Sequence, residues 1–116
     1  MKNNAKKNKK KVYVGLSVDI LHKGHINILK KANKFGDVIV GLLTDKAIAS
    51  YKKLPNLNYN QRELVLRNIR YVKRVIPQDT RSYKNNLIKI KPDFVVHEDN
   101  QWKKGIQKNV RLEIKK

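Results

Sequence analysis

The chain has 116 residues, of which 40% are hydrophobic and 32% charged, and this length and composition predict one folded domain. No apolar run approaches the roughly 18 residues of a membrane-spanning helix, and no apolar stretch follows the N-terminal lysines as in a signal peptide. The lack of cysteine excludes disulfides and thiolate metal sites. We therefore expect a cytoplasmic protein.

The charge of the chain is strongly positive, because it contains 28 lysines and arginines but only 9 acidic residues, which gives a net charge of +19. Such a field attracts polyanions, so nucleic-acid binding is one interpretation. A small phosphorylated substrate is the other. Six lysines lie in residues 1–11, a polar arm that we expect to be disordered. The remaining lysines follow no nucleic-acid-binding motif, so we favour the small substrate and do not expect nucleic acid as a partner.

The first half of the folded part alternates apolar and amphipathic segments. Val12–Ser17 is a continuous apolar run, which predicts a strand buried on both faces. Gly24–Phe35 has apolar residues at helical spacing and predicts an amphipathic helix. Val38–Thr44 predicts a second buried strand. In the polar stretch that follows, Leu54–Asn60 is rich in asparagine and contains a proline, so it predicts a loop.

The second half continues the same alternation. Gln61–Val72 has apolar residues at positions i, i+4 and i+7 and predicts a helix, followed by a short strand over Lys73–Pro77. Ser82–Ile90 predicts a third helix and Phe94–His97 a fourth strand. Lys103–Lys115 predicts a last amphipathic helix.

Strands that alternate with helices predict parallel pairing through right-handed crossovers. The expected fold is therefore α/β: a Rossmann-like, doubly wound parallel sheet in a three-layer α/β/α arrangement over residues 12–116. In such sheets ligands bind at the carboxyl ends of the strands, where the strand order reverses.

A pair of histidines follows the first predicted strand. His22 and His25 flank Gly24 at the expected start of a helix. A helix N-terminus offers amide donors and the positive end of a dipole, which suit a phosphate, and two histidines three residues apart can donate to the same anion. The plainer alternative is a capping or surface histidine. A metal site fits less well, since only Asp19 adds a carboxylate nearby.

Residues 17–26, Ser-Val-Asp-Ile-Leu-His-Lys-Gly-His-Ile, resemble the Asp-x-x-His-x-Gly-His signature of the cytidylyltransferase-like nucleotidyltransferases. The resemblance continues to about residue 111. It includes Gly41–Asp45, the Lys52-Lys53 pair before Tyr59-Asn60-Gln61-Arg62, Arg70-Tyr71-Val72 and Lys91–His97.

The resemblance implies transfer of CMP from CTP to a small acceptor, with Mg²⁺ bridging the phosphates. The residues that it implies at the triphosphate are His22, His25, Lys52 and Lys53. Those that it implies around the nucleotide are Ser17, Asp19, Gly24, Asp99 and Trp102, and those at the substrate anion are Arg62 and Arg70.

Several of these residues have plainer interpretations. Lys52-Lys53 can be surface lysines, Arg62 a structural residue paired with a helix end or a carboxylate, and Arg70 a solvated helix residue. Asp19 can cap the turn, and Trp102 can cover the core.

Two branches of the family are similar to the chain. The phosphonate cytidylyltransferase domain associated with phosphoenolpyruvate mutase implies a phosphonate acceptor such as 2-hydroxyethylphosphonate. Glycerol-3-phosphate cytidylyltransferase is the alternative. The family often forms dimers, so a homodimer is a further expectation.

The sequence departs from the family pattern near its end. Where the family has Gly-Asp-Asp-Trp, this chain has Glu98-Asp99-Asn100-Gln101-Trp102, and no serine- and threonine-rich turn follows before Lys116. We therefore expect the fold to lack the last strand and helix of the family. A truncated, non-catalytic nucleotide-binding module is the resulting alternative function.

Overall fold

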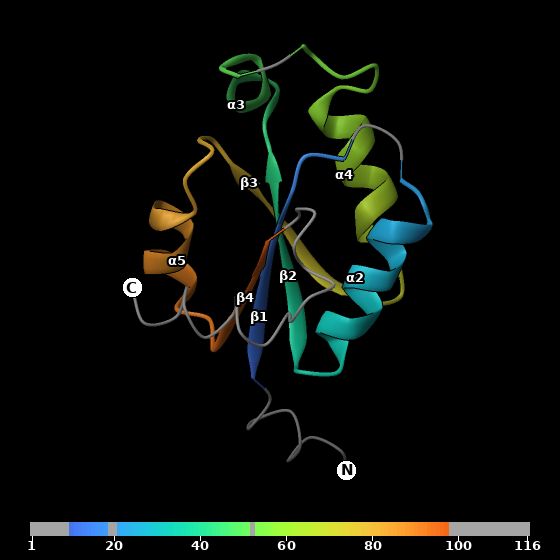
Figure 1. Ribbon diagram of the computed structural model, residues 1–116, viewed down its shortest axis with the longest axis vertical. Helices are drawn as coiled ribbons and strands as arrows, with labels where there is room; N and C mark the ends of the chain where they lie inside the picture. Colours follow the sequence, from blue (N-terminus) through green and yellow to red (C-terminus); the bar gives the residue numbers. More distant parts are fainter. Residues whose placement is uncertain (1–9, 19–20, 52, 98–116) are drawn as a thin grey trace.

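The computed structural model describes residues 10–18, 21–51 and 53–97. Within them, a parallel four-stranded sheet has the strand order β3-β2-β1-β4 (Figure 1). The elements in chain order are β1 (Lys11–Leu16), α2 (Lys23–Asn33), β2 (Asp37–Leu43), α3 (Asp45–Ala49), α4 (Tyr59–Arg67), β3 (Val72–Gln78), α5 (Lys84–Ile90) and β4 (Phe94–His97). The predicted Rossmann-like α/β fold is confirmed.

The order of the strands locates the expected ligand crevice. The chain moves outward from β1 to β2 and β3, and then returns to place β4 on the other side of β1. The reversal therefore lies between β1 and β4, at the carboxyl ends of the strands, which form the upper edge of the sheet in Figure 1. We call this edge the carboxyl edge.

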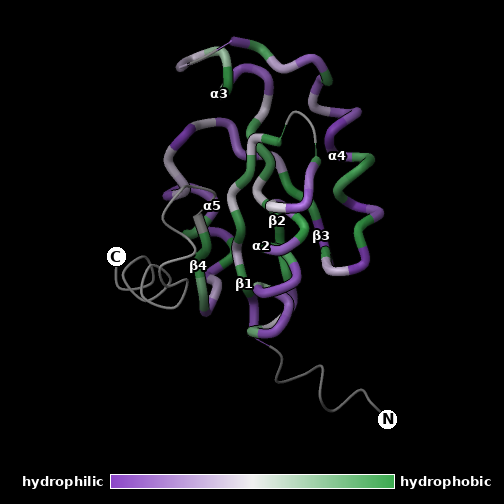
Figure 2. The backbone as a smooth tube through the Cα atoms, turned by 45° about the vertical axis from the view of Figure 1, so that its right-hand side comes forward, coloured by the Kyte–Doolittle hydropathy of each residue, from purple (hydrophilic) through white to green (hydrophobic). Residues whose placement is uncertain are grey.

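Helices cover both faces of the sheet. On one face, Val12, Val14 and Leu16 of β1 pack with α2 and α4; on the other, Tyr13 packs with α5 (Figure 1). Hydrophobic residues run along the central strands in Figure 2. Because consecutive strand residues point to opposite faces, a strand covered on both faces reads as an unbroken apolar run, as predicted.

The helix predicted over Gln61–Val72 is partly wrong, because the structure has α4 over Tyr59–Arg67 and starts β3 at Val72. Asn58, which we placed in a loop, is the N-cap: its Oδ1 accepts from the Gln61 amide, and Gln61 Oε1 accepts from the Asn58 amide, both at 2.9 Å. Such a reciprocal capping box fixes the start of a helix. Val65, expected in the buried stripe, is 43% exposed.

The structure also contains α3, which the sequence analysis missed within the polar stretch after β2. Thr44 caps this short helix, since its Oγ1 accepts from the Ala47 amide at 3.2 Å, and Ala47 and Ile48 are buried. A five-residue helix is too short to show a periodic apolar pattern, so only its cap could have indicated it.

Two other predictions concern the ends of the chain. The arm was predicted over residues 1–11, but Lys11 is the first residue of β1. Residues 1–9 lie outside the described part. The helix predicted over Lys103–Lys115 also lies outside it. Among the described residues, the structure has no helix with the length and apolar character to span a bilayer.

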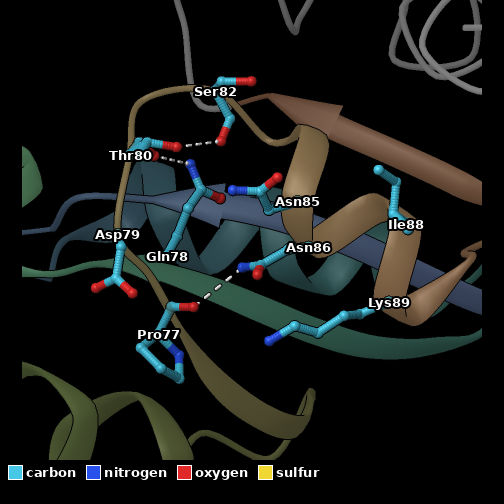
Figure 3. A pocket seen from close by; sticks show the side chains of 9 residues that line it. All are labelled: Pro77, Gln78, Asp79, Thr80, Ser82, Asn85, Asn86, Ile88 and Lys89. Carbon is cyan, nitrogen blue, oxygen red and sulfur yellow. Dashed lines mark hydrogen bonds between the residues drawn. The ribbon is translucent and has the colours of Figure 1, made fainter.

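A buried polar group joins β1, β3 and α5 on the α5 face of the sheet, and we call it the Tyr13 cluster: Tyr13, Gln78 and Asn86. Tyr13 Oη donates to Gln78 Oε1 at 2.5 Å and accepts from Asn86 Nδ2 at 2.8 Å. Asn86 Nδ2 also donates to the Pro77 carbonyl, and Gln78 Nε2 donates to the Thr80 carbonyl (Figure 3). The cluster therefore fixes the loop that leaves β3.

The Tyr13 cluster makes stability depend on pH. Desolvation raises the pKa of Tyr13 from 10.0 to about 12. The contribution of this group is complete below pH 10 and is lost as the pH rises towards 12, because only the unfolded chain ionises readily in that window. We expect the free energy of unfolding of the unmodified chain, minus that of Tyr13→Phe, to fall by about 1.4 kcal/mol per pH unit there. Urea titrations of both proteins from pH 9 to 12 measure this; parallel curves would contradict it.

Candidate functional site

The histidine turn lies at the carboxyl edge, between β1 and α2. The chain leaves β1 at Ser17 and Val18, and α2 begins at Lys23 directly after His22. His22 is exposed and His25 is 7% exposed. Ser17 and Gly24 accompany the histidines at this edge, so four of the predicted site residues come together; Asp19 lies outside the described residues.

The two histidines form a capping box with the backbone of α2. His22 Nδ1 accepts from the Gly24 amide at 3.0 Å, and His25 Nδ1 accepts from the His22 amide at 3.2 Å. Their ring centroids are 4.0 Å apart. The capping interpretation is therefore correct, and these hydrogen bonds determine which ring nitrogen of each histidine carries the proton. A neutral imidazole that accepts at Nδ1 carries its proton on Nε2, so both rings are assigned as Nε2–H donors.

Gly24 leaves room for the His22 ring at this turn. A Cβ atom at that position would lie 2.8 Å from Cε1 of His22, which is closer than side-chain contacts allow. The glycine thus lets the His22 ring fold over the start of the helix. The first turn of α2 contains no acidic residue, so the positive end of the helix dipole is not neutralised by the helix itself. The turn is suited to an anion.

The structure places Arg62 differently from a substrate ligand. Its side chain is fully buried, and all three guanidinium nitrogens donate within the chain. Nη2 pairs with Asp45 Oδ1 at 2.7 Å. The structural alternative considered for Arg62, pairing with a carboxylate, is what the geometry shows.

Arg70 lies at the opposite edge of the sheet from the histidine turn. It belongs to the turn between α4 and Val72, the first residue of β3, and parallel strands place all their amino ends at one edge. Its guanidinium carbon lies 5.6 Å from the centroid of the Tyr71 ring. The structure therefore does not bring Arg70 to the site that we predicted for it.

The remaining predicted residues are only partly described. Lys53 is exposed in the segment between α3 and α4, which follows the carboxyl end of β2. Lys52, Asp99 and Trp102 lie outside the described residues.

Arg81 is a cation at the carboxyl edge that the sequence analysis missed. It lies in the loop after β3, and its guanidinium carbon is 4.3 Å from the centroid of the Tyr51 ring. Gln78 Nε2 donates to the Arg81 carbonyl at 3.3 Å, so the Tyr13 cluster supports this loop. The available signal was topological, because loops that follow parallel strands line the ligand edge.

A cavity of about 400 Å³ opens beside the same loop, between the end of β3 and α5 (Figure 3). Its walls carry hydroxyl, amide and charged side chains, from Pro77, Gln78, Asp79, Thr80, Ser82, Asn85, Asn86, Ile88 and Lys89. None of the candidate site residues predicted from the sequence lines this cavity.

A doubly wound parallel sheet whose carboxyl edge carries a helix N-terminus and two ring N–H donors defines an α/β domain of the phosphate- and nucleotide-binding class. The sequence agrees with this class. The chain belongs to the cytidylyltransferase-like family, whose model matches residues 13–116. The family predicted from the histidine motif is thus confirmed.

Two relatives and one solved structure give the similarity in numbers. The chain is 32% identical over 91 residues to the FAD synthase of Archaeoglobus fulgidus, covering 74% of this chain and 66% of that protein. It is 40% identical over 70 residues to the glycerol-3-phosphate cytidylyltransferase of Bacillus subtilis, covering 60% of this chain and 54% of that protein. The matches thus span about half to two thirds of these relatives.

The solved structure of a lipopolysaccharide core biosynthesis protein from Thermoplasma volcanium GSS1 has the same fold. The TM-score is 0.74 at 24% identity, over 91% of this chain and 89% of that one.

Proposed function

We propose that this chain is a nucleotidyltransferase that transfers CMP from CTP to a small phosphonate, such as 2-hydroxyethylphosphonate, and releases pyrophosphate. The observation that carries the proposal is the histidine turn, where two histidine rings, assigned as Nε2–H donors, lie at the start of a helix whose first turn contains no acidic residue. Family membership supports the reaction type, and the sequence resemblance supports the acceptor class.

The proposed reaction is an in-line displacement. A phosphonate oxygen attacks the α-phosphorus of CTP and forms a new P–O bond, while the bond to the bridging oxygen breaks and pyrophosphate leaves with its electron pair. The acceptor is already an anionic nucleophile, so positioning and charge stabilisation do most of the catalysis. His22 and His25 donate to the charge that grows on the leaving phosphates, and exposed Lys53 adds a positive charge.

Mg²⁺ is part of the proposal as a companion of CTP. Among the described residues, no group of three or more His, Asp or Glu side chains could hold a metal ion. This arrangement fits a magnesium ion that is carried mainly by nucleotide phosphates and water, as is usual for that ion. When bound, the ion would neutralise phosphate charge beside the histidine turn.

Glycerol 3-phosphate is the alternative acceptor, because the Bacillus subtilis relative is named for that substrate. The base is a separate question, since another relative is named for making FAD, which is an adenine dinucleotide. We propose CTP as the nucleotide and a phosphonate as the acceptor, so the experiment must vary the nucleotide and the acceptor independently.

The test is a matrix of reactions with the full chain and Mg²⁺, in which CTP or ATP is combined with 2-hydroxyethylphosphonate or glycerol 3-phosphate. Pyrophosphate release is the readout. We expect kcat/KM to be highest for CTP with the phosphonate, by about tenfold or more over the other pairs. A faster reaction with glycerol 3-phosphate or with ATP would overturn that part of the proposal. CTP binding by calorimetry without turnover on any acceptor would favour the non-catalytic module.

A further inference from the structure

We infer that Arg62 is a positioning residue of the proposed transferase site, which it organises without contacting the substrate. The inference rests on the proposed function for its kinetic consequence only. Its structural basis is that one buried guanidinium joins the ends of two strands to Asp45 and Leu57, which lie before and after Lys53 in the chain.

Arg62 lies at the junction of β1 and β2. The last register pair of these strands is Leu16 with Leu42, and the next residues along each strand are Ser17 and Leu43. Nη1 of Arg62 donates to both of their carbonyls, at 3.0 Å and 2.8 Å. The guanidinium thus bridges the two strands where their ladder ends.

Arg62 also contacts both ends of the segment that contains Lys53. Nη2 donates to Oδ1 of Asp45, the first residue of α3, and Nε donates to the Leu57 carbonyl at 3.1 Å. Asp45 Oδ2 also accepts from the Tyr59 amide at 3.4 Å. Both ends of the stretch that contains Lys53 are therefore fixed to the same side chain.

The fork shape of arginine is needed for this arrangement. Three nitrogens donate in three directions from one planar group, whereas the single ammonium of lysine cannot reach four acceptors at once. The Arg62 side chain is buried whereas that of Asp45 is 43% exposed, so we attribute to the pair the selection of one arrangement of the chain rather than a large gain in stability. Ser17 lies only five residues before His22, so an error at this junction shifts the histidine turn.

The experiment compares Arg62→Lys and Asp45→Asn with the control Arg67→Lys. Arg67 is on the same helix and makes an exposed i,i+4 pair with Glu63, at 3.4 Å from Nε to Oε2. We expect Arg62→Lys to lower kcat about 100-fold, because a misplacement of about 1 Å costs this much, while KM for the acceptor changes less than threefold. A residue that bound the acceptor would instead raise its KM, and that result would overturn the inference.

A second readout does not depend on activity. Long-range ¹H–¹⁵N spectra of the histidine rings and the amide shifts of His22 and Gly24 report the capping box directly. We expect these signals to move in Arg62→Lys and Asp45→Asn and to stay in place in Arg67→Lys. Unchanged signals in a folded variant would overturn the inference, even if the unmodified chain showed no turnover and the proposed function failed. If Arg62→Lys does not fold, Asp45→Asn, which keeps an acceptor oxygen, carries the same test.

Discussion

Replacing His22 and His25 together by alanine is expected to lower kcat for pyrophosphate release by roughly 10⁴-fold, since removing one preorganised donor typically costs about 10²–10³-fold. The reason is that both rings are fixed by the backbone and carry their protons on Nε2, where the triphosphate is proposed to lie. Single-turnover kinetics with saturating CTP and acceptor measure the chemical step directly. Turnover within threefold of the unmodified chain would contradict the assignment.

The histidine result needs a stability control, because the same side chains cap α2. Loss of an N-cap costs about 0.5–2 kcal/mol of stability. His22→Asn separates the two roles: asparagine is a good N-cap, so we expect the thermal midpoint to recover while turnover does not. Lys23→Ala is the matched local control, since Lys23 lies between the histidines in sequence and is exposed. We expect its turnover to stay within about tenfold of normal.

Gly41→Ala is expected to lower the free energy of unfolding by about 3 kcal/mol, the sum of overpacking and lost hydrogen bonds in the core. Gly41 is in the middle of β2, and a Cβ atom there would lie 1.7 Å from Tyr13 Oη. The ring would have to move, which would break the bonds of Tyr13 to Gln78 and Asn86. Without that contact, alanine in a strand would be slightly favoured over glycine. Urea unfolding monitored by circular dichroism measures the loss.

The origin of that effect can be checked in a double-mutant cycle. Tyr13→Leu removes the phenol that the new Cβ would meet. If the clash is the cause, Gly41→Ala costs much less in the Tyr13→Leu background than in the unmodified chain. Equal costs in the two backgrounds would show that the cause lies elsewhere in β2.

The strands could be predicted from the sequence to within about a residue or two because the sheet is covered on both faces. Phe94–His97 was predicted with the observed bounds. The helical region after β2 was harder. Asn58 was predicted in a loop and Thr44 at the end of a strand, and only their side-chain hydrogen bonds show that they are helix caps. Val72 continues the apolar period of the predicted helix, but in the structure it belongs to β3. The prediction was wrong here because an apolar period does not show where a helix ends.

The candidate site likewise contains residues that could be predicted from the sequence and residues that could not. The histidine turn could be predicted because its geometry is local: both histidines and Gly24 lie within four residues. The arginines could not be assigned, because their roles depend on side-chain direction and on the edge of the sheet to which each belongs. Arg62 points into the protein, Arg70 lies at the amino edge, and Arg81 comes to the carboxyl edge through the loop after β3. These are properties of the assembled sheet rather than of sequence spacing.

The capping box makes the start of α2 and the proposed anion site one thermodynamic unit. The bonds that hold the first helical turn are the same bonds that orient the two rings. Fraying of this turn therefore releases the donors, and a bound triphosphate resists fraying, because a ligand that binds only the ordered turn stabilises it. Affinity for the anion and local helix stability must rise and fall together, so a change that loosens the N-terminus of α2 weakens binding without touching the ligand.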